Sequence, residues 1–264
     1  MIREVILHIL SRSPRDYGFD QTRWTLSCLL GILSGWLKVT TEAGLWNVLD
    51  RLALRYRQGW EHLVSPDPLA ELKLAYIEAI LARAQAFPEQ IVVLWLDELT
   101  FYRLPSPAPA WSDGQAKRGP KAQLTGGNNT KARIGAVMNH HSGTVHYLLR
   151  SVCGIKQLIK LYQHIRMAYS EAQEIYVIQD CWPIHFHPQV SQMACSLGIT
   201  LVPLPTYSSW RNPIEKLWRW LKQEVLHMHP WADDWPRTKA EVSRFLDQFQ
   251  LPNLALLRYV GLLD

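Results

Sequence analysis

The chain has 264 residues, a hydrophobic fraction of 48% and a net charge of +5 at neutral pH. That length suffices for one large or two smaller domains, and no uninterrupted apolar run reaches the roughly 18–20 residues that a membrane span requires. The four cysteines have no paired short spacing, which argues against a disulfide framework or a cysteine zinc site and favours a reducing cytosol.

Three helices are predicted at the start of the chain. Apolar residues recur with helical period over residues 2–11 and 21–36, and Thr40 or Thr41 can cap a third helix. Helix, short turn and capped helix are typical of a helix-turn-helix. We therefore predict a small all-α DNA-binding domain in residues 1–65, with 56–63 as a candidate wing and with Lys38 and Thr41 as candidate DNA contacts. A plain helical bundle fits the same pattern.

The remainder of the chain alternates strands with helices. Ser65-Pro66-Asp67-Pro68 follows the first domain, and a helical connector is expected over residues 66–88. The second domain, expected to be the catalytic one, then covers residues 89–264 and includes a long loop at 105–130. Its expected strands are 90–97, 131–139, 144–150, 174–180 and 199–203, and its expected helices are 154–168, 188–197, 212–227 and 238–249. This order predicts an α/β fold, a mixed sheet flanked by helices.

Positive charge is concentrated in one segment. Residues 99–170 contain ten lysines and arginines and a single acid, a net +9 that exceeds the excess of the whole chain. A concentrated basic surface is typical of nucleic-acid binding, although a solvated basic face gives the same count. The candidate phosphate contacts are Lys117, Arg118, Lys121, Lys131 and Arg133.

Three carboxylates occupy positions that suit phosphoryl transfer. Asp97 closes one apolar run, Asp180 closes another, and Glu215 lies 35 positions after Asp180 at the expected start of a helix. Hard divalent cations prefer oxygen ligands, and two such ions can hold the attacking and leaving oxygens of an in-line displacement.

The blocks around these carboxylates resemble a known family. Asp97-Glu98, Asp180 followed by His185, and Pro205-Thr206-Tyr207-Ser208 leading into Asn212-Pro213-Ile214-Glu215 are similar to the DDE endonuclease domain of mariner-like transposases. The bacterial insertion-sequence branch, the IS-six-thirty group, is the best match. The resemblance covers residues 90–225.

The resemblance implies an RNase H-like fold and DNA transposition, with insertion at TA dinucleotides. It also implies two Mg²⁺ or Mn²⁺ ions held by Asp97, Asp180 and Glu215. The secondary candidates are Glu98, which should point away from Asp97 on the strand, His185, and Asn212 as a helix cap. The expected partners are double-stranded DNA, as transposon ends and target, and a second copy of the chain, since two ends must be paired. No membrane partner is expected, and the expected location is the cytoplasm, at the nucleoid.

The sequence departs from the family pattern in three places. Cys181-Trp182 stands where Asn-Ala is usual, residues 207–211 replace the usual Ser-Pro-Glu-Leu, and the N-terminal region has room for about one helix-turn-helix unit. Two alternatives to a transposase therefore stay open. One is an RNase H-like nuclease without strand transfer, and the other is a truncated or domesticated DNA-binding regulator.

Overall fold

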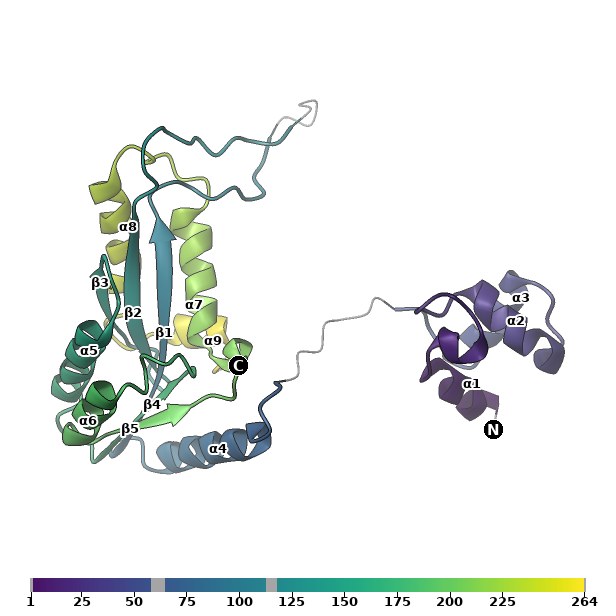
Figure 1. Cartoon of the computed structure of the whole chain (residues 1–264), viewed down its shortest axis with the longest axis horizontal. Helices are drawn as coiled ribbons and strands as arrows, with labels where there is room; N and C mark the ends of the chain where they lie inside the picture. The colour runs from purple at the N-terminus through teal and green to yellow at the C-terminus, as the bar shows by residue number, and fades with distance from the viewer. Residues whose placement is uncertain (1, 58–64, 113–117, 264) are drawn as a thin grey trace. The chain divides into compact units, whose positions relative to one another are not determined.

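A computed structural model describes residues 2–57, 65–112 and 118–263 (Figure 1). The chain divides into two compact units, Met1–Leu63 and Val64–Asp264. Among the described helices, none is both long enough and apolar enough to cross a bilayer.

The N-terminal unit is a small helical domain. It contains α1 (Ile2–Leu10), α2 (Leu26–Leu37) and α3 (Glu42–Arg51), with a short 3₁₀ helix between α1 and α2. Six buried aliphatic side chains form its core: Ile6, Ile9, Leu29, Leu33, Leu45 and Leu49. The helix expected over 21–36 begins only at Leu26, because Thr25 caps it by accepting a hydrogen bond from the Cys28 amide.

The turn between α2 and α3 has defined ends. Lys38 closes α2 in a left-handed conformation with φ of 53°, and the Thr41 hydroxyl caps α3 by accepting from the Gly44 amide at 3.1 Å. Of the two residues expected to cap this helix, Thr40 and Thr41, the cap is therefore Thr41. The candidate wing lies mostly in residues 58–64, outside the described residues.

The helix expected as a connector belongs to the second unit. α4 (Ala70–Ala86) buries Ile77, Ile80 and Ala84 in the same core as strand β1. It therefore packs on the sheet rather than standing apart from it as a separate connector.

The second unit is built on a five-stranded mixed sheet in the order β3-β2-β1-β4-β5. Strands β1 (Ile91–Tyr102), β2 (Lys131–Asn139) and β3 (Val145–Arg150) are antiparallel neighbours. Strands β4 (Glu174–Gln179) and β5 (Ile199–Pro203) run parallel to β1. This arrangement confirms the predicted RNase H-like α/β fold.

Strand β1 is longer than its apolar run. Its parallel pairing with β4 stops at Trp95, but its antiparallel pairing with β2 continues through Asp97 to Tyr102. The expected end of this strand at Asp97 is therefore wrong. Asp97 lies within the strand, just beyond the point where β4 leaves its side.

Side chains alternate between the two faces of β1. Val92, Leu94 and Leu96 pack toward α5 (Ile155–Ala168) and α6 (Pro188–Ser196). Val93 and Trp95 pack toward α4, α7 (Ile214–Leu221), α8 (Trp235–Asp247) and α9 (Leu254–Val260). Figure 1 shows α5 and α6 on one side of the strands and α7 and α9 on the other. The expected helix 212–227 is α7 followed by a π-helical turn, Lys222–Leu226.

Candidate active site

Asp97 projects from β1 on the α7 side of the sheet. Trp218, buried on α7, donates from its indole Nε1 to Asp97 Oδ2 at 2.8 Å. Burial, followed by repulsion from Glu215, raises the pKa of Asp97 to about 7. The carboxylate is thus held in a site that disfavours its charged form.

Asp180 is the first residue after β4, the strand that pairs with β1 in parallel as far as Trp95. Its Oδ1 accepts from the backbone amide of Trp182 at 3.0 Å and from His185 Nδ1 at 2.8 Å. Burial alone would raise the pKa of Asp180, but the hydrogen bonds from His185 and Trp182 outweigh it and lower the pKa. This carboxylate is therefore ionised and oriented, and its side chain is 49% exposed.

Glu215 lies in the first turn of α7. Its pKa is raised by burial and by the charge of Asp180, against the opposite pull of Lys222 and Arg219. The charge of Asp180 therefore affects the pKa of Glu215, and the charge of Glu215 affects the pKa of Asp97. The three side chains nevertheless come from separate parts of the chain.

Asn212 fixes the start of α7 against β1. Its buried side-chain amide donates from Nδ2 to the carbonyl of Leu96 at 2.8 Å. The expectation that this side chain caps the helix is wrong: the N-cap position is Pro213, and no side chain caps that end. Because Leu96 precedes Asp97, the amide instead ties the start of the Glu215 helix to the strand that carries Asp97.

Glu98 points to the opposite face from Asp97, as its neighbouring position on the strand predicted. There its Oε1 lies 2.9 Å from Nε2 of His185, whose side chain has no exposed surface. Burial lowers the pKa of His185, but its hydrogen bonds to Asp180 and Glu98 outweigh this and raise the pKa to about 10. A protonated His185 thus donates to both carboxylates. Trp182 packs edge-on against its ring, with centroids 5.4 Å apart.

Two of these contacts were not predicted from the sequence. No contact between Trp218 and Asp97 was predicted, although the position of Trp218 three residues after Glu215 places both on one face of α7. It also did not join Glu98 to His185, since the two are 87 positions apart. The signal available was the pair of polar residues Glu98 and His185 flanking otherwise apolar elements.

The three carboxylates match a divalent cation in donor type and in charge. Their oxygens are the ligands that Mg²⁺ prefers. The pKa values of Asp97 and Glu215 are raised, by burial first and then by the charge of another acid of the three. Within the described residues, no three His, Cys, Asp or Glu side chains are arranged so that together they could hold a metal ion. Asp97 and Asp180 are instead engaged by Trp218 and His185, so a metal ion would compete with these two hydrogen bonds.

The candidate DNA contacts are placed on several elements. Arg118 and Lys121 are exposed on the segment before β2, Lys131 is exposed at the start of β2, and Arg133 is half-buried on it. Arg133 pairs in register with Arg150 of β3, which extends this basic surface across two strands. Lys117 lies outside the described residues.

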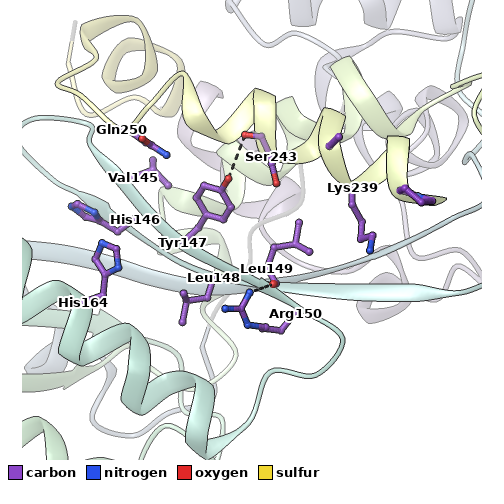
Figure 2. A pocket seen from close by; sticks show the side chains of 12 residues that line it. Val145, His146, Tyr147, Leu148, Leu149, Arg150, His164, Lys239, Ser243 and Gln250 are labelled. Carbon is purple, nitrogen blue, oxygen red and sulfur yellow. Dashed lines mark hydrogen bonds between the residues drawn. The ribbon is translucent and has the colours of Figure 1, made fainter. Parts of the chain in front are cut away.

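A cavity of about 820 Å³ lies apart from the carboxylates, along the outer edge of β3 (Figure 2). Figure 2 shows Tyr147 directed toward Ser243 of α8, to whose carbonyl its hydroxyl donates, while His164 of α5 lies near His146. None of the candidate site residues lines it; the lining residues are Val145, His146, Tyr147, Leu148, Leu149, Arg150, His164, Pro236, Lys239, Ala240, Ser243 and Gln250.

Comparisons with known proteins agree with this geometry. A family model described as "DDE superfamily endonuclease" matches residues 92–234, more than half of the chain. A Shigella sonnei protein, "Insertion element IS630 uncharacterized 39 kDa protein", is 25% identical over 252 residues, which cover 94% of this chain and 69% of that protein.

Solved structures share the fold. The Mos1 mariner paired end complex with Mn superposes with a TM-score of 0.59 at 16% identity, covering 92% of this chain and 77% of that one. The Mos1 strand transfer complex gives a TM-score of 0.55 at 16% identity, covering 92% of this chain and 76% of that one. At this level of identity the likeness concerns the fold alone.

Proposed function

Because this chain belongs to the DDE superfamily of endonucleases, among the IS630 and mariner-like transposases, we propose that it cuts the ends of an insertion sequence and joins them to target DNA. The predicted family and the predicted enzyme class are confirmed. The two reaction steps, and insertion at TA dinucleotides, are the part that we propose.

The observation that carries this proposal is the electrostatic coupling of three carboxylates. Asp97, Asp180 and Glu215 come from β1, from the end of β4 and from α7, yet the charge of Glu215 helps to raise the pKa of Asp97 and the charge of Asp180 helps to raise that of Glu215, in each case after burial. We assign these three residues as ligands of two Mg²⁺ or Mn²⁺ ions. Bound divalent ions supply an activated water or 3′ hydroxyl and stabilise the leaving oxygen.

The surrounding residues hold the ligands in place. His185 orients Asp180 and is itself held by Glu98, while Trp218 orients Asp97. Such supporting hydrogen bonds fix ligand geometry in metal sites generally. Asn212 keeps the helix of Glu215 against the strand of Asp97.

We infer that the partner is double-stranded DNA. The N-terminal unit has the helical pair and capped turn of a helix-turn-helix, with Lys38 and Thr41 at the turn, and we assign it to transposon-end recognition. Arg118, Lys121 and Arg133 would bind phosphates. The enzyme would act as a homodimer, since two ends must be joined in one event, and in the cytoplasm at the nucleoid.

The test is cleavage of labelled DNA carrying the repeats that flank the gene, with Mn²⁺ or Mg²⁺. Wild type is compared with Asp97→Asn, Asp180→Asn and Glu215→Gln. Glu78→Gln, an exposed carboxylate on α4, is the matched control. We expect cleavage by wild type and the control, and a loss of about a thousandfold or more in each of the three variants, as for groups that act as one unit.

The products separate the alternatives. Cleavage together with joined products supports a transposase, whereas cleavage without joining identifies a nuclease. Wild-type DNA binding with no cleavage under either metal would refute the proposal and favour the regulator.

A further inference from the structure

Two aromatic side chains stand in solvent on the loop that leads from β5 to Glu215. Tyr207 is 79% exposed and Trp210 is 40% exposed. Trp210 lies in a short 3₁₀ helix, Ser209–Arg211, immediately before Asn212. Aromatic rings usually contribute large buried areas to a core, so a pair left exposed on the segment that leads to Glu215 suggests a ligand.

The loop is anchored on both sides of Tyr207. The amide and the hydroxyl of Thr206 both donate to Asp67 Oδ2, at 3.0 and 3.3 Å, and the Thr206 carbonyl accepts from Ser65 Oγ at 2.6 Å. On the other side, Ser208 and Asn212 are buried. Tyr207 is therefore held outward by a fixed backbone.

The backbone of Tyr207 is also unfavourable for its side chain. Its φ of 53° lies in the left-handed region, which a β-carbon disfavours and which glycine or asparagine occupies more easily. Strained backbone of this kind persists where the surroundings enforce it, and it clusters at functional sites. The strain and the exposure of Tyr207 together indicate that the ring is placed for contact with something outside the chain.

We propose that Tyr207, with Trp210, forms a stacking platform for an unpaired nucleobase next to the phosphate being cut. This inference rests on the proposed function, which places DNA at the three carboxylates. In-line attack requires the reacting phosphate to enter the acidic site, and a base splayed from the duplex opens that path. Aromatic faces hold such bases with little regard to sequence.

The charge next to the rings agrees with a nucleic-acid strand. Arg211, directly after Trp210, is exposed, and a guanidinium there suits a phosphate of the same strand. Tyr207 and Trp210 thus offer the apolar face and Arg211 the cationic contact, the combination that single-stranded binding sites use.

The test measures binding of a forked DNA, with 2-aminopurine at its first unpaired position, against a fully paired duplex of the same sequence. The full chain is used in EDTA, so the readout does not depend on cleavage. We expect wild type to prefer the fork and to quench the 2-aminopurine fluorescence. Tyr207→Ala should reduce that preference about tenfold, within the range for loss of one base–aromatic stack.

Three further variants make the result specific. Tyr207→Phe keeps the ring and should keep both preference and quenching. Tyr207→Asn removes the ring but suits the left-handed backbone, so it should lose the preference while the thermal midpoint stays equal or rises. Phe87→Ala removes an exposed ring at the opposite end of β1 and should change nothing.

The outcomes distinguish failure of the platform from failure of the proposed reaction. Fork preference that survives both Tyr207→Ala and Tyr207→Asn overturns the platform, even where wild type cuts and joins DNA. If Tyr207→Ala loses self-association in sedimentation while its fork binding is unchanged, the rings contact a second copy of the chain. That result would also overturn the platform. A Tyr207-dependent preference in a wild type that never cleaves supports the platform and refutes the proposed reaction.

Discussion

Replacing Asp97 by asparagine should stabilise the protein while abolishing its activity. Asparagine is nearly isosteric and keeps an oxygen that can accept from Trp218, but it has no charge to repel Glu215. The pKa of Asp97 is raised from 3.8 to about 7. A group whose pKa is raised on folding contributes stability at pH values below its unfolded pKa, and that contribution is lost as the pH rises through the folded pKa.

The expected magnitude follows from that shift. At 1.36 kcal/mol per pKa unit, the raised pKa of Asp97 destabilises the folded, metal-free protein by about 4 kcal/mol at about pH 8, where the folded carboxyl is ionised. At about pH 5 the folded carboxyl is protonated while the unfolded one is ionised, and the cost falls to about 1.5 kcal/mol. Relative to wild type, Asp97→Asn should therefore raise the free energy of unfolding by amounts of that order, more at the higher pH.

Urea unfolding in EDTA at both pH values measures the effect, with Glu78→Gln as the control that should change nothing. Adding Mn²⁺ should stabilise wild type but not Asp97→Asn, because a ligand that binds only the folded state raises its stability. The reasoning is refuted if Asp97→Asn matches or falls below wild type at about pH 8 without metal. That result would mean that the folded site does not disfavour the charged form of Asp97.

Three other predictions concern residues around the site and the sheet. His185→Gln should weaken Mn²⁺ binding about 10–100-fold in a calorimetric titration, because the hydrogen bond that orients Asp180 is altered; unchanged affinity would contradict a positioning role. Burial lowers the pKa of His140 to about 4, and Trp95 donates to its ring, so stability present above about pH 6.5 should fall as the pH drops toward 4. His140→Asn should remove about 2 kcal/mol of that loss at about pH 4.5 in urea unfolding, and an identical acid profile in the variant would exclude His140 as its source. Arg133→Gln should lower the slope of log DNA affinity against log salt by about one, measured by fluorescence anisotropy, whereas an unaltered slope would mean that Arg133 touches no phosphate.

Local patterns in the sequence were sufficient to predict most of the secondary elements and to single out the three acids. The apolar run before Asp97, the alternation of β2 and the helical period of α5 each depend on a few neighbouring residues, so they are readable in one dimension. The seven-residue helix α9 was missed because it is too short to display a period.

Only the tertiary structure decided what surrounds each acid. The bonds from Trp218 to Asp97, from Asn212 to the Leu96 carbonyl and between His185 and Glu98 join residues 121, 116 and 87 positions apart. The length of β1 likewise depended on pairing with β2, which local hydrophobicity does not report. The sequence by itself thus determined which residues are candidates for the chemistry, because residue type and local period are local properties. Burial, pKa and orientation were set by chain packing, because they depend on segments that meet only after folding.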